Sequence, residues 1–401
     1  MNILFSQCHY VYDESEGGSE PYWAFRIADS ICQIYPNSMV ITGRAQTKTT
    51  KSYRIHELQK NKLRLDMSMK NALLFNLQYF FSTVQELLHR PYSIVHHVLP
   101  FGIGSTFNLI ALLGFTRTTP FVLGPIQSML NYEHSDVDAS DIRNFNRGTN
   151  SSISLPKIVF SFVNFLSFRT LAKASKIIVI NSFTRDLLVG QGVSNEKIVI
   201  ISPGVDSRRF AYIPYQDKQG SVLELISVSY LIERKAVDVI LKALQLLLAR
   251  SKNFRLRIVG DGPQLSLLKE LVRDYGLSEH VVFEGFVKHE QVHEHYKRAH
   301  VFISMSRAEG FASVCLEAMS CGLAVVATKV GGFHDAVQDG YNGYLVDIDD
   351  HVVLANKLFT LIQNQDIIAT FGKHSRAIVE SNYDWDVAII PRYLDVYRSL
   401  V

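Results

Sequence analysis

The chain has 401 residues, enough for two domains of ordinary size, and 47% of them are hydrophobic, which can fill two cores. Its 41 basic and 38 acidic side chains give a formal net charge of +3, so the composition excludes a disordered chain and offers no support for nucleic acid as a main partner. The four cysteines lack metal-ligand spacing and are expected to be small buried side chains in a reducing compartment.

The N-terminus predicts a first strand rather than a signal peptide. Residues 1–6 have neither a basic start nor a long apolar core. No window of the sequence reaches the roughly 18 apolar residues of a membrane-spanning helix. We therefore expect a cytoplasmic protein.

Short apolar runs alternate with amphipathic stretches along the chain, a pattern that predicts parallel strands joined by crossover helices. In the first half the predicted strands are Ile3–Ser6, Met39–Thr42, Ile94–His97, Phe121–Leu123, Ile177–Ile180 and Ile198–Ile201. In the second half they are Leu223–Val228, Leu256–Val259, Val281–Glu284, Val301–Ser304, Ala324–Ala327 and Tyr344–Val346. The two series predict two doubly wound α/β units.

The joint between the units is expected at Ser202–Asp206. Pro203 and Gly204 interrupt both periodicities, and a new series of strands and helices starts soon after them. An ordinary loop inside one large sheet agrees less well with the number of strands on either side. Residues 387–400 have apolar side chains at helical spacing and predict a C-terminal amphipathic helix.

Two candidate ligand loops lie in the first half. Gly17 and Gly18 follow the first strand, where paired glycines let the backbone approach a ligand and the next helix start can bind an anion. His96 and His97 end the third strand, at the sheet edge where parallel folds bind ligands. A plain glycine turn and a structural histidine are the alternatives.

In the second half, Ser227–Asp238 connects a strand to a helix and contains Lys235, which could reach a phosphate as a mobile point charge. A solvated lysine is the alternative. Further on, His289 and His293 flank Glu290 in a zincin-like pattern. We reject a zinc site there, because the helix is short and its apolar positions already serve an α/β unit.

The most informative segment is Glu309–Glu317. A loop glutamate and a Gly turn lead into a short helix that carries a second glutamate and ends at Gly322. The helix start offers unpaired N–H groups and a positive dipole end, which suit a phosphate. Glu317 is four residues beyond Ser313, ~6 Å along the helix, where a carboxylate can meet hydroxyls next to that phosphate.

The run from Arg307 to Asp347 resembles the nucleotide-sugar site of the retaining glycosyltransferases of family 4, whose hallmark is two glutamates separated by seven residues. This resemblance is specific in that run and extends less specifically over nearly the whole chain. It implies a GT-B architecture, an α/β fold in which two Rossmann-like doubly wound domains face a cleft. The implied parts are an acceptor domain, 1–203, a nucleotide-sugar donor domain, 204–378, and a C-terminal helix, 379–401, that crosses back to the first domain.

The resemblance also assigns roles to single residues. Gly17 and Gly18 match a Gly-Gly loop that faces the donor diphosphate. His97 keeps the family's spacing to Gly102 and is expected to act on the donor sugar, with His96 as the alternative because the family's two histidines are not adjacent.

In the second half, Leu231 and Lys235 match the family's phosphate clamp, but the clamp's Gly, Arg and Gly are replaced, by Ser229, Tyr230 and Ala236. Arg234 is our candidate for the missing guanidinium, and Val287 is expected to meet the nucleotide base through its backbone. The implied catalytic residues are His97, Glu309 and Lys235. The implied donor-binding residues are Gly17, Gly18, Arg234, Lys235, Val287, Glu309, Gly310, Phe311, Ala312, Ser313, Val314 and Glu317.

The implied function is a glycosyltransferase that moves a sugar from a nucleotide donor to an acceptor with retention at the anomeric carbon. We expect a UDP-sugar such as UDP-glucose, and a saccharide or lipid-linked saccharide acceptor in polysaccharide biosynthesis. Helix-start amides and Lys235 would stabilise the leaving diphosphate, Glu309 would orient the sugar hydroxyls, and Glu317 would hold the ribose. No second carboxyl marks a nucleophile, so the sequence favours front-face substitution, without a metal or other cofactor.

Two other functions could use the same site: a GT-B epimerase or phosphorylase, and a nucleotide-sugar-binding protein without turnover.

Residues 155–170 bear on the location of the protein, because they are rich in phenylalanine and flanked by Lys157 and Arg169. We favour a core helix there. A helix lying on a membrane surface is the alternative, which would give peripheral contact with the inner face of the plasma membrane.

Overall fold

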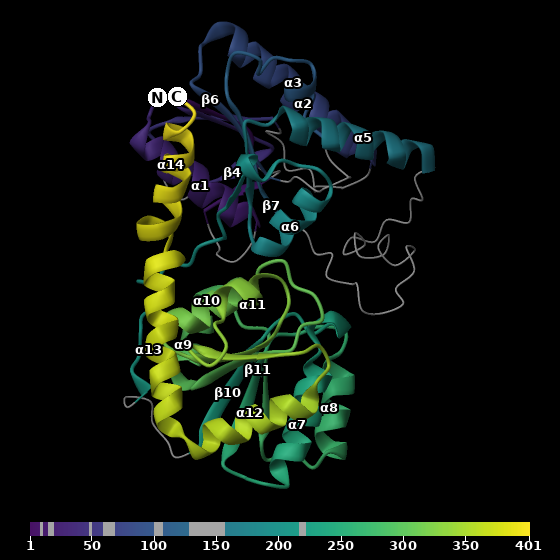
Figure 1. Ribbon diagram of the computed structural model, residues 1–401, viewed down its shortest axis with the longest axis vertical. Coiled ribbons are helices and arrows are strands. Elements are labelled where there is room, and N and C mark those ends of the chain that lie inside the picture. The colour runs from purple at the N-terminus through teal and green to yellow at the C-terminus, as the bar shows by residue number, and fades with distance from the viewer. Residues whose placement is uncertain are drawn as a thin grey trace. The chain divides into compact units, whose positions relative to one another are not determined.

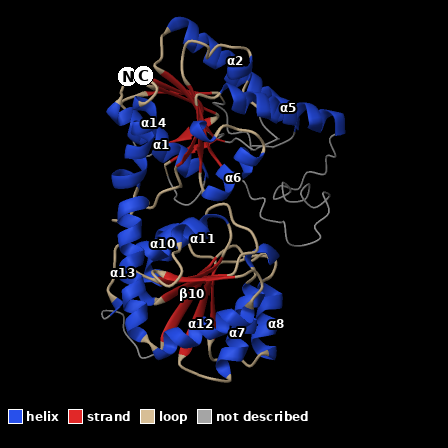
Figure 2. Ribbon diagram, viewed as in Figure 1, coloured by secondary structure: helices blue, strands red, loops and turns tan. Residues whose placement is uncertain are grey.

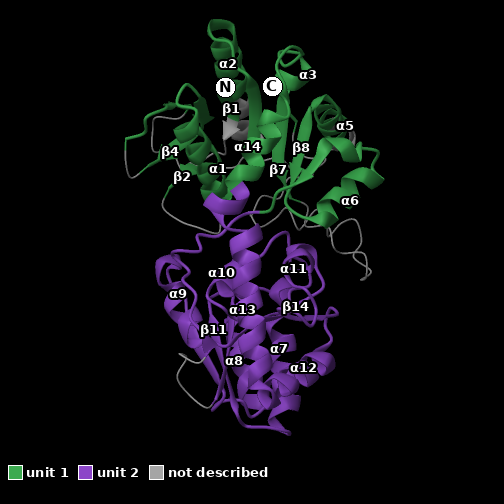
Figure 3. Cartoon of the chain, turned by 60° about the vertical axis from the view of Figure 1, so that its left-hand side comes forward, with its two compact units in different colours: residues 1–128, 132–202, 390–401 green, residues 129–131, 203–389 purple. Residues whose placement is uncertain are grey.

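The computed structural model describes residues 1–8, 11–14, 20–47, 50–58, 69–99, 107–127, 157–215 and 222–401. These residues form two compact units. The first contains the described residues up to Ser202 together with Ile390–Val401, and the second contains Pro203–Ile389 (Figure 3). The expected Gly17-Gly18 loop lies outside the described residues.

The first unit is built on a parallel sheet, whose strands are drawn in red in Figure 2. Its strand order is β5-β3-β1-β6-β7-β8-β9. The strands of this sheet are β1 (Ile3–Cys8), β3 (Met39–Thr42), β5 (Arg54–Glu57), β6 (Ile94–Leu99), β7 (Phe121–Ile126), β8 (Lys176–Val179) and β9 (Ile198–Ile200). A separate parallel pair joins β2 (Val11–Asp13) to β4 (Arg44–Gln46). Central strands such as β7 are buried along their whole length, as expected for a sheet covered on both faces.

Helices cover this sheet, and the last of them comes from the C-terminus. They are α1 (Glu20–Ile34), α2 (Met69–His89), α3 (Leu109–Leu112), α5 (Lys157–Lys173), α6 (Ser182–Gly190) and α14 (Ile390–Arg398) (Figure 1). The C-terminal helix α14 packs against α1 and buries Tyr393 and Tyr397. The first unit is therefore completed by residues from the far end of the sequence.

The second unit contains a parallel sheet with the order β12-β11-β10-β13-β14-β15. Its strands are β10 (Leu223–Val228), β11 (Phe254–Val259), β12 (Val281–Gly285), β13 (Val301–Ser304), β14 (Ala324–Thr328) and β15 (Gly343–Val346). From the centre of the sheet, β10, β11 and β12 follow one another to one edge. The strands β13, β14 and β15 follow one another from the centre to the other edge. This is the strand order of a Rossmann fold.

The helices of the second unit are α7 (Val237–Leu248), α8 (Leu265–Asp274), α9 (His289–Arg298), α10 (Ser313–Ser320), α11 (Gly331–Ala336), α12 (His351–Gln363) and α13 (Gln365–Asn382) (Figure 1). Apolar residues at helical spacing bury one face of α7, where Ile240, Leu244 and Leu247 have no exposed surface. Each such side chain contributes about 1.5–3 kcal/mol on burial. The start of α12 is capped by Asp350, whose carboxylate accepts the Val353 N–H at 2.9 Å.

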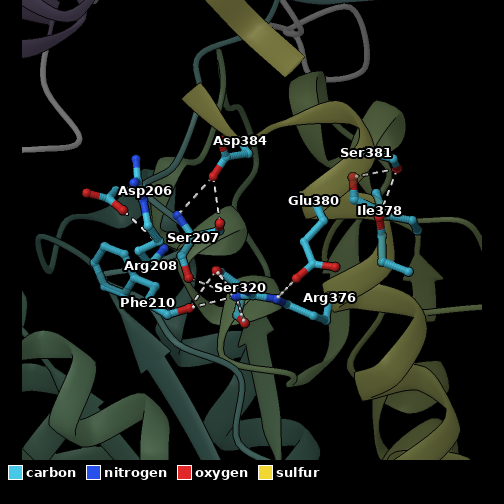
Figure 4. A network of polar contacts seen from close by, with 11 residues as sticks. Asp206, Ser207, Arg208, Phe210, Ser320, Arg376, Ile378, Glu380, Ser381 and Asp384 are labelled. Carbon is cyan, nitrogen blue, oxygen red and sulfur yellow. Dashed lines mark hydrogen bonds and ion pairs between the residues drawn. The ribbon is translucent and has the colours of Figure 1, made fainter. Parts of the chain in front are cut away.

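The chain returns to the first unit at Ile390, later than the sequence-based boundary at residue 379. The reason lies in residues 384 and 385, which are tied to the linker that opens the second unit. The Ser207 hydroxyl donates to Asp384 at 2.6 Å (Figure 4), and the backbone N–H of Trp385 donates to the carbonyl of Val205 at 3.2 Å. A π-helix, Trp385–Ile389, then leads into α14.

Within the described ranges, no helix combines the length and the apolar character that crossing a bilayer requires.

Candidate functional site

The loops that carry the expected chemistry lie at the carboxyl edge of the second sheet. Strands β10 and β13 are neighbours there, although β11 and β12 come between them in the sequence. Parallel α/β sheets bind ligands outside the carboxyl ends of their strands, at the point where the strand order reverses. The loop after β10 contains Arg234 and Lys235, and the loop after β13 contains Glu309. The structure thus brings three predicted site residues together.

Glu309 lies beside two cations. Its Oε2 atom is 2.5 Å from Nζ of Lys235 and 3.5 Å from Nη1 of Arg234. The three side chains are mostly buried, with 11 to 18% of their surface exposed. Because two cations face one carboxylate where water screens weakly, this arrangement favours a further anion.

Arg307 fixes the two loops to each other. Its backbone N–H donates to the carbonyl of Arg234 at 2.9 Å, and its Nη1 donates to the carbonyl of Glu233 at 2.7 Å. Its Nε atom pairs with Asp349, on the loop after β15, at 2.9 Å. An arginine from the β13 loop thus sets the position of the short 3-10 helix that carries the two cations.

Helix α10 begins directly after the Glu309 loop, at Ser313, and no side chain caps its first turn. The Ser313 hydroxyl is buried without a hydrogen-bond partner among the described residues. An uncapped helix start offers N–H groups and a positive dipole end to an anion, and a buried unpaired hydroxyl is unfavourable until something bonds to it. The segment Phe311–Val314 therefore suits phosphate oxygens.

Two glycines after β14 shape this loop. Gly331 has a φ of +47°, and a Cβ atom there would lie 1.7 Å from the carbonyl oxygen of Glu309. A Cβ atom on Gly332 would lie 2.3 Å from the ring of Phe311. Any side chain at either position would displace the loop that carries Glu309 and Gly310.

The three departures from the family's clamp have different consequences. Ala236, where the family has glycine, has a left-handed backbone with a φ of +48°, a conformation that costs a non-glycine residue ~1 kcal/mol. Tyr230 is 63% exposed, and the buried hydroxyl of Ser229 lacks a partner among the described residues. Among the described residues, Arg234 brings a guanidinium to 3.5 Å from the Glu309 carboxylate.

Glu317 lies one turn into α10, and its carboxylate is held by α9. Its Oε1 atom is 2.7 Å from Nε2 of His289, and its Oε2 accepts from the Tyr296 hydroxyl at 3.3 Å. Only 3% of the surface of Glu317 is exposed. A contact of this carboxylate with ribose stays a prediction.

His289 and His293, which form the zincin-like pattern, have separate partners. His289 contacts Glu317, whereas His293 contacts the carbonyl of Glu290 on its own helix at 2.9 Å. Among the residues that the structure describes, no group of three or more His, Cys, Asp or Glu side chains could hold a metal ion. Sequence reasoning missed the pairing of His289, because Glu317 comes from another helix, 28 residues further along.

Val287 follows β12 at the same edge of the sheet. The loop after β11 is bonded to the end of β12, because the N–H of Gly260 donates to the carbonyl of Gly285, the last residue of β12, at 2.8 Å. The neighbouring ring of Phe286 is 77% exposed. The backbone contact of Val287 with a nucleotide base stays a prediction.

The two candidate histidines lie in the first unit, and both are buried. His96 Nε2 is 2.8 Å from the carbonyl of Gly124, and its Nδ1 is 2.7 Å from the Tyr397 hydroxyl. A carbonyl can only accept, so Nε2 carries the proton and Nδ1 accepts from the tyrosine. Burial lowers the pKa of His96 to about 3, so the ring is neutral. Both its nitrogens are used inside the unit, which favours a structural role for His96.

His97 contacts Asn108, the residue that caps the start of α3. Asn108 caps α3 through Oδ1, which accepts the Ala111 N–H, so its Nδ2 faces Nδ1 of His97 at 3.1 Å. The amide donates to Nδ1, and the neutral ring therefore carries its proton on Nε2. Such a ring can donate a hydrogen bond, which agrees with the role predicted for His97 and leaves that role untested.

The second unit matches a known protein family. Residues 213–383 match the family described as glycosyl transferases group 1. A GDP-mannose-dependent alpha-(1-6)-phosphatidylinositol monomannoside mannosyltransferase of Mycolicibacterium smegmatis is 30% identical over 228 residues, 53% of this chain and 59% of the relative. The putative colanic acid biosynthesis glycosyltransferase WcaL of Escherichia coli is 33% identical over 203 residues, 49% of this chain and 50% of WcaL. The chain thus spans less than two thirds of the length of these relatives.

Solved structures resemble the chain over its whole length. Sucrose-phosphate synthase from Thermosynechococcus elongatus has a TM-score of 0.69 at 18% identity, and covers 100% of this chain and 98% of its own. HepE of Anabaena, solved in complex with UDP, has the same TM-score and identity and covers 100% of both chains. These likenesses show the GT-B fold, with two Rossmann-like domains. Residues 213–383, which lie in the second unit, are thus similar to the glycosyl transferases group 1 family.

Proposed function

We propose that this protein is a glycosyltransferase that transfers a sugar from a nucleotide-sugar donor to a saccharide or lipid-linked saccharide acceptor. The observation that carries the proposal is the pairing of Glu309 with Lys235 and Arg234 beside the uncapped start of α10. One carboxylate for sugar hydroxyls and several donors for a diphosphate are the groups that bind the two halves of a sugar nucleotide. The names of the relatives support the same reaction class.

The charges explain how the site would promote transfer. Breaking the bond between sugar and diphosphate builds negative charge on the leaving oxygen. Lys235, Arg234 and the N–H groups of Phe311–Val314 are fixed donors for that charge, and preorganised donors usually make the largest contribution to catalysis. Since these groups carry the positive charge that a metal ion supplies elsewhere, we propose a metal-independent reaction.

We further propose front-face substitution with retention at the anomeric carbon. Double displacement needs a carboxylate nucleophile and a second carboxyl group about 5 Å from it. Glu309 Oε2 is already engaged by Lys235 and Arg234, and Glu317 is held by His289 and Tyr296. Neither carboxylate is arranged as a free nucleophile, so the leaving phosphate itself is the proposed base for the acceptor hydroxyl.

The proposed donor is a UDP-sugar, and UDP-glucose is the first to test. The solved complex of HepE with UDP supports this base, whereas the mycobacterial relative is named for GDP-mannose. The proposed pathway is polysaccharide biosynthesis, which the name of WcaL supports. The proposed location is the cytoplasm.

One experiment separates transfer from the other functions of such a site. Thermal shifts with UDP-, GDP- and ADP-sugars identify the donor, and release of the nucleotide is then measured with saccharide acceptors, with and without EDTA. We expect one sugar nucleotide to stabilise the protein and to release its nucleotide at the same rate in EDTA. Epimerised donor, stabilisation without any release, or loss of release in EDTA would each contradict part of the proposal.

We propose that Arg234 takes the place of the arginine that the family's phosphate clamp has where this chain has Tyr230. We expect Arg234→Ala to raise the Kd of the donor about tenfold or more, because a charge-assisted hydrogen bond to phosphate is lost. Adding Tyr230→Arg to this variant should recover part of the affinity, since it restores the guanidinium at the family's position. Arg273→Ala, on the exposed side of α8, is the control. If calorimetry shows an unchanged donor Kd in Arg234→Ala, Arg234 does not replace the missing clamp arginine.

Peripheral membrane contact is proposed for the face formed by α2, α3 and α5. Phe81 on α2 and Phe165 on α5 are 65% and 54% exposed, so α5 is not wholly a core helix. The residues of α5 include Arg169 and Lys173 and no acid. We expect Phe81→Asp with Phe165→Asp to reduce flotation with vesicles of anionic lipid while transfer to a soluble acceptor continues. Equal flotation of variant and wild type would remove this surface from the proposal.

A further inference from the structure

Helix α9 presents two hydrogen-bond donors to Glu317. His289 and Tyr296 are seven residues apart, two helical turns, so they lie on the same face of α9. That face meets α10, where the Glu317 carboxylate receives His289 on Oε1 and Tyr296 on Oε2. Each carboxylate oxygen is therefore oriented by a different side chain.

Tyr296 is a permanent donor in this arrangement. Burial, together with the nearby charge of Glu317, raises the pKa of Tyr296 well above its usual value, so the hydroxyl keeps its proton. The single hydroxyl proton is shared between the Glu317 carboxylate, at 3.3 Å, and the carbonyl of Val314 in the first turn of α10, at 3.2 Å. Tyr296 thus ties the position of the carboxylate to the start of the helix that is proposed to bind phosphate.

His289 is held in place by an aromatic neighbour. Its ring packs edge-on against Phe210, with 5.8 Å between the ring centroids. The carbonyl of Phe210 accepts from the Ser320 hydroxyl at 2.6 Å and from Nη1 of Arg376 at 3.1 Å (Figure 4). Ser320 is the last residue of α10, so the support of His289 is fixed to the same helix as Glu317.

A carboxylate has about four acceptor positions, two on each oxygen. With one taken by His289 and one by Tyr296, each oxygen of Glu317 retains a position for a further donor. The ribose of a nucleotide offers two adjacent hydroxyls. A side chain that fixes the carboxylate plane would therefore decide how well Glu317 distinguishes a ribose from a deoxyribose.

We propose that His289 is a positioning residue of the donor site, which holds the Glu317 carboxylate in the orientation that binds the ribose hydroxyls. This inference rests on the proposed function and names a residue that acts through Glu317 rather than on the sugar. The side chain of His289 is 21% exposed, whereas that of Glu317 is 4% exposed.

The test measures how well the protein distinguishes a ribonucleotide from its 2′-deoxy form, and it does not depend on the transfer activity. Calorimetry gives the Kd of UDP, dUDP, GDP and dGDP for wild type, His289→Leu and His289→Gln. We expect wild type to bind the ribonucleotide about tenfold more tightly than its 2′-deoxy form, as the loss of a hydrogen bond to a charged group implies. In His289→Leu this ratio should fall close to one. In His289→Gln, whose amide can donate to Glu317, it should recover in part.

His293→Leu is the matched control, because His293 is on the same helix and contacts only groups of α9 in its hydrogen bond and ion pair. Its ratio should equal that of wild type. A wild-type ratio in His289→Leu, or no recovery in His289→Gln, would overturn the positioning role while leaving nucleotide binding established. If neither UDP nor GDP binds wild type, the proposed function fails, and the inference falls with it.

Discussion

Glu309→Gln is expected to lower the rate of sugar transfer by about 10²- to 10³-fold, the effect of removing one preorganised polar group from a transition state. The amide keeps the shape of the side chain but loses the charge that holds Lys235 and Arg234. Because both cations remain, affinity for a nucleoside diphosphate should stay the same or increase. Steady-state kinetics and calorimetry measure the two effects separately.

Glu294→Gln is the control for this variant. Glu294 is exposed on α9 and pairs with Lys297, on the same helix, at 2.8 Å. Its transfer rate should match that of wild type. Wild-type transfer by Glu309→Gln, or an equal loss of transfer and of diphosphate affinity, would show that Glu309 does not act on the transferred sugar.

His97→Ala is expected to reduce transfer about 100-fold or more, with nucleoside diphosphate binding unchanged. A side chain that donates a hydrogen bond or moves a proton in the transition state typically contributes 10²- to 10⁴-fold. We expect the protein to remain folded, although His97 is buried and bonded to Asn108, so its loss should lower the free energy of unfolding by about 2–5 kcal/mol, as for other large-to-small changes in a core. Transfer kinetics and thermal unfolding together check this result.

His96→Ala makes the comparison informative, because it removes the neighbouring histidine. His96 is completely buried and bonded to Gly124 and Tyr397, so its loss should lower the free energy of unfolding by about 2–5 kcal/mol, as for other large-to-small changes in a core. Transfer per folded molecule should change less than in His97→Ala. The opposite pattern, a stable but inactive His96→Ala and an active His97→Ala, would exchange the roles of the two histidines.

Much of the fold could be predicted from the sequence. Every predicted strand, from Ile3–Ser6 to Tyr344–Val346, corresponds to a strand of the structure. Buried parallel strands are continuous apolar runs, which makes them visible in a sequence. The missed strands β2, β4 and β5 are three or four residues long, and β4 and β5 are partly exposed and polar. Their pairing depends on neighbours, so no local pattern indicates them.

The candidate site could be proposed from the sequence where its residues are contiguous. Glu309, Gly310 and the start of α10 are adjacent residues, and turn chemistry indicates such a unit without knowledge of the rest. The contacts of Arg307 with Glu233 and Asp349 were not predictable, because these residues come from three separate loops. The same reason applies to the zincin-like pattern, in which one histidine contacts Glu317 on another helix.

By itself, the sequence determined the alternating strands and helices, the loop with Glu309 and the glycines that shape it, since these depend on neighbouring residues and on backbone preferences. Only the tertiary structure decided the partners of His96 and His97, where the chain returns to the first unit, and which side chains hold Glu317 and Arg234. Tyr397 reaches His96 from 301 residues away, and such a partner is chosen by chain topology, which brings distant segments together. Periodicity in a sequence reports local geometry, whereas partners across a sheet or between helices are set by the packing of the whole unit.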